Sequence, residues 1–285
     1  MSLASLGWGQ QDLNGVIDIH VHVLPDVRNR SIDAIDLAKL AKKRGMRGLV
    51  LKNHHESTAA LAYVVRKEVP GIEIFGGIDL DLSVGGINLN AVQQMLLMTG
   101  GWGRVVWLPT LDAENQVRVS KENRPFVSIS KNGHLLPEVE ELIALVQKNQ
   151  LTLETGHSSP EEGLMVVREA RKAGVEHVIV THALASPVRM SIPQMQEAAR
   201  AGAYIEFVYS ALLAPQKLAV ADYVKAIREV GPASCILSSD LGQPENPLHP
   251  EGMALFFEIL RKAGISQADI DLMSKTNPAR ALGLK

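Results

Sequence analysis

Short apolar stretches alternate along the chain with longer segments in which apolar residues recur every three or four positions. Eight of the short stretches are rich in valine, isoleucine and leucine, and they predict strands at residues 16–22, 48–54, 72–78, 104–110, 151–157, 177–182, 203–208 and 235–240. Continuous apolar runs of this length are typical of parallel strands that are covered on both faces. The pattern therefore predicts a buried parallel sheet.

The segments between these runs have the period of helices. Helices are expected at residues 31–44, 57–68, 90–98, 137–149, 159–174, 192–201, 219–230 and 252–263. Ser159 followed by Pro160 is a typical helix start, because serine caps free N–H groups and proline suits the first turn. Glycines directly after several of these segments indicate where the helices end.

Eight strand–helix units in 285 residues predict an α/β fold of the (β/α)8 TIM-barrel type, with residues 1–285 as a single domain and residues 1–13 as a tail. A doubly wound sheet is the alternative, but no glycine-rich phosphate loop follows the first predicted strand. The longest irregular link covers residues 111–136. Asn132-Gly133 within it predicts a small hairpin inserted between strands four and five.

The composition narrows the function classes. A formal net charge of −2 offers no electrostatic footprint for nucleic acid or an anionic membrane. The single cysteine, Cys235, excludes an internal disulfide and fits a reducing, cytoplasmic compartment. No apolar run is long enough to span a membrane. A small-molecule substrate is therefore the expected partner, and a homo-oligomer is compatible with the sequence.

Two histidines, His20 and His22, end the first predicted strand. Side chains alternate along a strand, so both imidazoles share a face, with Cα atoms roughly 6.5–7 Å apart. Two imidazoles at that separation can converge on one metal ion, although a pair of buried structural histidines fits the same pattern. The alternation places Asp18 on their face and Ile17, Ile19 and Val21 on the opposite one.

Further polar residues fall at the carboxyl ends of later predicted strands, where the active sites of such barrels lie. They are Lys52, His54 and His55 on the second strand, His157 on the fifth, His182 on the sixth and Asp240 on the eighth. Alternation groups Lys52 and His54 with Val50, His157 with Leu153 and Thr155, His182 with Val178 and Val180, and Asp240 with Ile236 and Ser238. It does not decide which way Glu206 points.

This arrangement resembles the amidohydrolase superfamily of metal-dependent hydrolases. The matching motifs, which span residues 16–284, are Asp18-Ile19-His20-Val21-His22, His157, Thr181-His182, Ser239-Asp240 and Asn277-Pro278-Ala279-Arg280-Ala281-Leu282-Gly283. The stretch at 51–58 is not shared with the well-known members, and it indicates a less-studied, amidohydrolase-like branch.

The resemblance implies that His20, His22 and His157 bind one divalent metal, expected to be zinc. It implies that Asp240 touches the metal weakly and acts as the base for its water, and that His182 binds a second metal or polarises the substrate. Two-metal members carry a carboxylated lysine or a glutamate that bridges both ions at the end of strand four, and residues 107–110 here offer neither. One metal is therefore expected. A second ion held through Asp112, Glu114 or Lys52 is the alternative.

The predicted function is hydrolysis of a C–N or C–O bond in a small polar or anionic molecule, such as an amide, cyclic amide, lactone or ester. Lys52 and His54 are expected to contact the substrate, because a lysine at the barrel mouth is a ready partner for a carboxylate. A decarboxylase or hydratase on the same scaffold is one alternative, and a non-catalytic binding protein is another. Residues 111–136 show no readable substrate preference.

Overall fold

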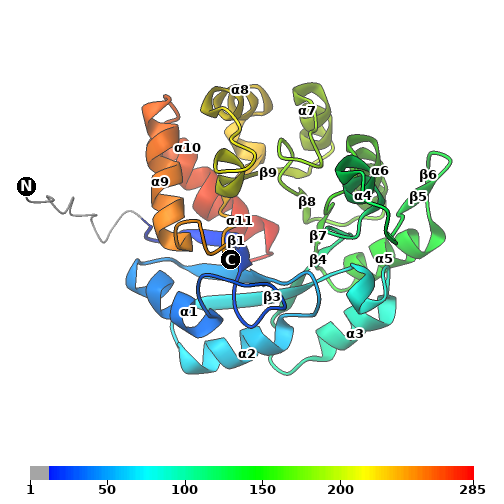
Figure 1. The fold of residues 1–285 in the computed structure, drawn as a ribbon, viewed down its shortest axis with the longest axis horizontal. Helices are drawn as coiled ribbons and strands as arrows, with labels where there is room; N and C mark the ends of the chain where they lie inside the picture. The colour runs from blue at the N-terminus through cyan, green and yellow to red at the C-terminus, as the bar shows by residue number, and fades with distance from the viewer. Residues whose placement is uncertain (1–12) are drawn as a thin grey trace, which may run out of the picture.

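Eight parallel strands form the inner ring of the structure, and helices surround them (Figure 1). The computed structural model describes residues 13–285. The strands are β1 (Ile17–His22), β2 (Gly48–Lys52), β3 (Glu73–Asp79), β4 (Gly103–Trp107), β7 (Thr152–Glu154), β8 (Val178–Val180), β9 (Tyr204–Val208) and β10 (Cys235–Ser238), in that order around the sheet. The last strand returns to the first, because His22 N–H donates to the Leu241 carbonyl and Asp240 N–H donates to the His20 carbonyl. The predicted (β/α)8 barrel is confirmed.

The predicted helices are also present. They are α1 (Ala34–Lys43), α2 (Ala59–Glu68), α3 (Leu89–Leu97), α5 (Pro137–Lys148), α6 (Pro160–Lys172), α7 (Ile192–Arg200), α8 (Val220–Val230) and α9 (His249–Lys262). Ser159 and Glu162 cap each other's backbone at the start of α6, as the serine–proline signal indicated. The predicted hairpin consists of β5 (Ser130–Lys131) and β6 (His134–Leu135), joined by Asn132 and Gly133 with φ of 54° and 78°.

Several short elements were not predicted. Helix α4 (Glu114–Ser120) lies inside the link that was expected to be irregular. The chain ends in α10 (Gln267–Asp271), a π-helical turn η4 (Leu272–Thr276) and α11 (Asn277–Ala281), and it contains the 3₁₀ turns η1 (Leu82–Val84), η2 (Tyr209–Leu212) and η3 (Pro232–Ser234). One or two turns carry too few apolar repeats to show a helical period.

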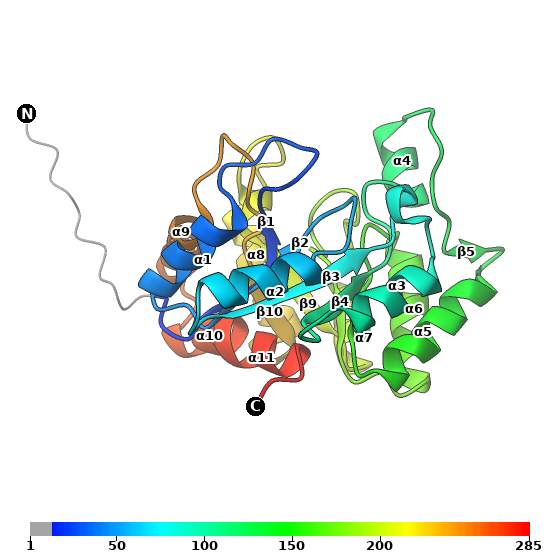
Figure 2. The same cartoon turned by 90° about the horizontal axis from the view of Figure 1, so that it is seen from below.

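Apolar side chains close the barrel interior at the amino ends of the strands. Its apolar filling consists of Ile17, Ile19, Val50, Phe75, Val105, Trp107, Ile179 and Ile236, against which Ala279, Ala281 and Leu282 pack. Figure 2 shows α11 at the end opposite the loops that follow β1 and precede α9. In the described residues this filling and α11 close the amino ends of the strands, which leaves the carboxyl ends, where barrel enzymes carry their sites.

The expected alternation along β1 is wrong at one point. Ile17 and Ile19 belong to the interior filling, although they were placed opposite the histidines. The pairing of β1 with β2 runs from Asp18–Leu49 to Val21–Leu51, so β1 has one extra residue there. Such a bulge reverses the faces of the residues that follow it. Asp18 therefore does not share the face of His20 and His22, and its carboxylate accepts the Ser239 N–H instead.

Strand alternation also does not explain His157 and His182. Strands β7 and β8 end at Glu154 and Val180, before either histidine is reached. Leu153, Val178 and Val180, expected on the histidines' faces, pack in the outer layer between sheet and helices. For the eighth strand the interior face of Ile236 and Ser238 is as expected. Asp240, however, follows the end of β10 with a φ of 50°, so its direction comes from the turn and not from strand alternation.

Leu13 is the one residue of the predicted tail that the structure describes, and it is fully buried in the outer core; residues 1–12 lie outside the described part. Among residues 13–285, no helix combines the length and apolar character needed to cross a membrane.

The thiol of Cys235 is expected to be unreactive in the folded protein. It is fully buried, and burial raises its pKa to about 12, so only about one thiol in 10⁴ is ionised at pH 8. A colorimetric disulfide reagent should therefore find no reactive thiol in native protein at pH 8 and one thiol per chain in guanidinium chloride. Stoichiometric labelling of the native protein within minutes would contradict this expectation.

Candidate metal centre

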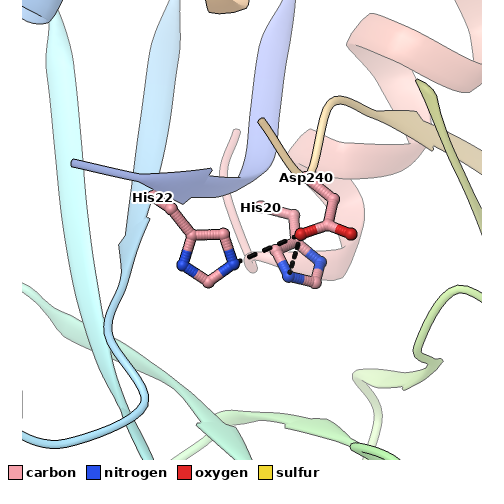
Figure 3. Close-up of side chains that lie close together, drawn as sticks. All are labelled: His20, His22 and Asp240. Carbon is pink, nitrogen blue, oxygen red and sulfur yellow. Dashed lines mark ion pairs between the residues drawn. The ribbon is translucent and has the colours of Figure 1, made fainter. Parts of the chain in front are cut away.

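Three side chains converge at the open end of the barrel. The Nε2 atoms of His20 and His22 lie 3.3 Å and 3.2 Å from Oδ1 of Asp240 (Figure 3). The two histidines come from β1, and Asp240 follows β10 with a φ of 50°. Oδ2 of Asp240 accepts the Ser210 hydroxyl at 2.7 Å, which fixes the carboxylate plane. Two imidazole nitrogens and one carboxylate oxygen thus face a common point, which is a donor set that suits zinc.

Glu206 orients the imidazole of His20 through its Nδ1 atom. Its Oε1 lies 3.1 Å from Nδ1 of His20 and accepts the Ser238 hydroxyl at 2.5 Å. Its Oε2 accepts the backbone N–H of His182 at 2.8 Å. A carboxylate beside Nδ1 keeps the proton on that nitrogen and leaves Nε2 free to bind a metal. Sequence alternation had left Glu206 undecided. The neighbours Ile205 and Phe207 are apolar and pack in the outer layer. This alternation was the sequence signal that Glu206 points into the barrel.

The two carboxylates near His20, those of Asp240 and Glu206, require a positive charge between them. Burial alone would raise the pKa of Asp240, but His20 and His22 hold it well below its usual range. Burial opposes ionisation of Glu206 as well, and His20 keeps its pKa low. Burial disfavours the imidazolium of His20, yet Asp240 and Glu206 raise its pKa to about 9. A proton on His20 therefore balances the negative charges of Asp240 and Glu206. A divalent ion at Nε2 of His20 would balance the same charges in place of that proton, so these residues fit a metal.

His22 is neutral, because burial lowers its pKa well below the usual value. Its Nε2 faces Asp240, and its Nδ1 lies 3.4 Å from Nη2 of Arg30. The ring also stacks on His54 with centroids 4.8 Å apart. A neutral imidazole in a fixed orientation is the form in which histidine binds metals.

His157 lines the same cavity but is not among the three side chains whose donor atoms converge most closely. Gly156 before it has a φ of 59° and lies against the carbonyls of Leu108 and Pro109. Nδ1 of His157 lies 2.9 Å from the side-chain Oε1 of Gln116, a residue of α4. Nδ1 therefore carries the proton, and Nε2 is the free nitrogen. Gln116 was missed because α4 itself was not predicted.

His182 lies between His20 and His157. Its ring stacks on His20 with centroids 6.0 Å apart and lies 4.8 Å from the ring of His157. Its backbone has a φ of 27°, which turns the chain out of β8 toward the cavity. Burial lowers its pKa, and its buried Nδ1 has no partner among the described residues. A neutral imidazole with a free nitrogen can bind a metal or donate to a developing charge.

The structure corrects the expected setting of Lys52. Its side chain does line the cavity, and Lys52 and His54 share the interior face as predicted. However, the ammonium is fully buried and lies 3.0 Å from Oδ2 of Asp79, so it is not the free, solvated cation that was expected. Nδ1 of His54 lies 3.2 Å from the same oxygen and 2.7 Å from the Thr110 hydroxyl. Asp79 ends β3, the neighbouring strand, and sequence alone did not pair it with Lys52.

Two further groups of donor atoms lie nearby. One contains His20, Glu154 and Glu206, and the other contains His54, Asp79 and Asp81. Burial, followed by the charge of Glu206, raises the pKa of Glu154, which favours its protonated form. Asp81 is engaged by the N–H groups of Thr110, Leu111 and Asp112 and so holds the loop after β4. The two loop acids considered for a second metal also have partners, since Asp112 pairs with Arg124 and Glu114 with Arg118.

A cavity of about 190 Å³ joins these residues. It is lined by His20, His22, Arg28, Arg30, Lys52, His54, Leu111, His157, His182, Ala185, Ser186, Gln216, Asp240 and Gln243. The residues predicted to bind metal, act in catalysis or contact substrate therefore all border one space, whereas the adjacent His55 does not. Its size suits a small molecule rather than a polymer.

Comparison with known proteins gives one family and a group of similar folds. The profile of a family of unknown function (DUF6282) matches residues 15–206. A search of curated proteins found no match. A mutant organophosphorus hydrolase from Deinococcus radiodurans superposes with a TM-score of 0.63 at 16% identity, covering 94% of this chain and 93% of that one.

Two other structures are similar over almost their whole length. An amidohydrolase (cog3618) from Burkholderia multivorans with bound Zn has a TM-score of 0.61 at 13% identity, covering 95% of this chain and 99% of that one. A putative 2-pyrone-4,6-dicarboxylic acid hydrolase from Pseudomonas putida has a TM-score of 0.62 at 15% identity, covering 94% and 97%. These structures share the barrel fold of this chain.

Proposed function

The chain belongs to DUF6282, a family of unknown function, and we propose that it is a metal-dependent hydrolase that cleaves a C–N or C–O bond in a small polar or anionic molecule. The observation that carries this proposal is the convergence of His20, His22 and Asp240 at the open end of a barrel cavity, with Glu206 setting the tautomer of His20. The printed names of the similar folds, which include hydrolases and one structure with bound Zn, support the same class.

In this proposal His20, His22 and His157 hold one divalent ion through their Nε2 atoms, and Asp240 lies beside it. Zinc is the expected ion, because three imidazoles and a carboxylate form a typical catalytic set with room for water. When bound, zinc lowers the pKa of a water molecule to about 7 and so makes a nucleophile available at neutral pH. A single ion is proposed because Thr110, after β4, is engaged with Asp79 and Asp81 and offers no bridging carboxylate.

Asp240 is the proposed general base. Its carboxylate is ionised, and its Oδ1 faces the point at which the two imidazoles converge. It can accept a proton at Oδ1 from the attacking water and return that proton to the leaving nitrogen or oxygen. His182 is neutral and borders the cavity, and its buried Nδ1 has no partner among the described residues; in this proposal its imidazole stabilises negative charge on the substrate's carbonyl oxygen. We also propose a reducing, cytoplasmic setting, which the single free and buried thiol of Cys235 fits.

A lyase is the second candidate, and the absence of a bridging ligand after β4 is the feature that favours it. The two reactions differ in their products. Hydrolysis adds the elements of water across a bond, whereas decarboxylation releases CO₂ and hydration leaves a single product. Mass spectrometry of products from a panel of lactones, cyclic amides and small carboxylic acids distinguishes them.

Protein purified without chelator is expected to contain about one equivalent of divalent metal per chain. His20→Ala and His22→Ala should each lower that content severalfold, because each removes one of few ligands. His134→Ala, which changes an exposed histidine on β6, should leave it unchanged. Elemental analysis of the three variants and the wild type provides the measurement.

Metal removal should also lower the melting temperature, since an ion bound only by the folded state stabilises it. Full activity on an identified substrate in metal-free protein would refute the proposed function. Two equivalents of metal that both depend on His20 would refute only the single-ion part.

A further inference from the structure

Two arginines, Arg28 and Arg30, lie on the segment between β1 and α1 and line the cavity above His22. Neither was singled out by the sequence, because they lie six and eight residues beyond the end of β1. Arg30 is buried, with only 5% of its side chain exposed, whereas Arg28 is exposed at the rim. Both therefore border the space in which a substrate would lie.

Asp26 holds this segment in place. Its Oδ2 accepts Nε of Arg30 at 2.6 Å, and its Oδ1 accepts the backbone N–H of Arg28 at 3.1 Å. Nη2 of Arg30 lies 3.4 Å from Nδ1 of His22, and Nη1 has no hydrogen-bond partner among residues 13–285. The Asp26 carboxylate thus orients the Arg30 guanidinium toward the candidate metal ligands. It also fixes the backbone of Arg28. The segment is pre-organised rather than a free surface loop.

The charge balance at the rim of the cavity leaves Arg28 in excess. Lys52, the third basic group, is neutralised by Asp79, and Asp26 balances only Arg30. Arg28 has no ion-pair partner within the described part of the chain. The remaining rim side chains, Ser186, Gln216 and Gln243, are uncharged. A rim with surplus positive charge and unused guanidinium N–H groups is suited to an oxyanion, because the guanidinium fork matches carboxylate and phosphate oxygens.

We propose that Arg28 and Arg30 form an oxyanion subsite that binds a carboxylate or phosphate group of the substrate while the scissile bond lies at Asp240. This inference rests on the proposed function for its catalytic part, but anion binding itself is independent of any reaction. It moves the anion contact from Lys52, where the sequence placed it, to the segment after β1. The cavity of about 190 Å³ limits the substrate to a small anionic molecule.

The test uses metal-replete full-length protein, calorimetric titration with malonate and with inorganic phosphate, and constant ionic strength so that screening does not change. Arg28→Gln is expected to weaken binding of the preferred probe about tenfold or more, the usual loss for a charge-assisted contact. Arg28→Lys should recover part of it, because it keeps the charge and loses the fork. Arg200→Gln, an exposed arginine in the last turn of α7, is the matched control and should bind like wild type.

The two probes identify the group that the subsite takes, since malonate presents carboxylates and phosphate does not. Unchanged affinity of Arg28→Gln for both probes, or an equal loss in Arg200→Gln, would overturn the subsite. Metal content is measured on the same samples. If binding depends on Arg28 but the samples take up no divalent metal when zinc is supplied, the subsite stands and the proposed metal-dependent hydrolase fails, so the two failures are distinguishable.

Discussion

Replacing Asp240 by asparagine is expected to lower turnover by about 10²–10⁴-fold, the usual range for loss of a group that transfers a proton. Asparagine has the same shape and can still accept the Ser210 hydroxyl, but it cannot take a proton from water. Metal content should stay close to that of wild type, because the histidines still hold the ion. The measurement is turnover and elemental content of one preparation, on any substrate found in the product panel.

Two controls separate the base from a general effect of the change. Asp222→Asn alters an exposed aspartate in the first turn of α8 and should retain full turnover. Ser210→Ala removes only the hydrogen bond that fixes the carboxylate plane and should cause a smaller loss than Asp240→Asn. Wild-type turnover in metal-loaded Asp240→Asn would show that another group is the base and that the proposed mechanism is wrong.

The Lys52→Met variant is expected to lose about 3–5 kcal/mol of unfolding free energy at neutral pH, because it leaves the Asp79 carboxylate buried without its cation. Lys39→Met is the matched control. Its ammonium pairs with Asp36 on the surface of α1, and exposed pairs contribute only about 0–1 kcal/mol. Urea unfolding followed by circular dichroism measures both losses.

The loss in Lys52→Met should depend on pH. Burial raises the pKa of Asp79, and the charge of the Lys52 ammonium is the strongest influence that opposes this rise. A carboxyl group with a raised folded-state pKa destabilises the fold as pH increases through that value. The deficit should therefore be smallest near pH 4 and grow toward pH 8.

Lys52→Met/Asp79→Asn should be less destabilised at pH 8 than Lys52→Met alone, since the double variant buries no charge. Equal stability of Lys52→Met and Lys39→Met would show that the Lys52–Asp79 pair is not formed as the structure has it. Together with Asp240→Asn, this variant separates a group that acts on the substrate from one that maintains the barrel interior.

The metal-ligand candidates were accessible from sequence because their signals are local. An apolar run ending in His20-Val21-His22 marks a strand end, and the same kind of signal places Asp240 after the eighth strand. Parallel strands bring their carboxyl ends to one edge, so identifying eight strand ends was sufficient to predict that these side chains border one cavity.

The partners of those residues were not accessible in the same way. Glu206 reaches His20 across 186 residues of chain, Asp79 reaches Lys52 from the adjacent strand, and Gln116 reaches His157 from a helix of two turns. Each pairing depends on the register between strands or on the path of a loop, and no periodicity in one segment encodes either. The orientation and charge state of the site depend on these contacts.

The sequence by itself therefore determined the eight-unit barrel and the residues at its open end, because period, caps and strand ends are properties of short segments. The tertiary structure alone decided which way these residues point and what balances their charges. A one-residue bulge in β1 placed Ile17 and Ile19 inside the barrel, and left-handed backbone carried His182 and Asp240 to the cavity. The reason is physical: the energy of a buried polar group is set by partners that only packing brings within hydrogen-bond distance.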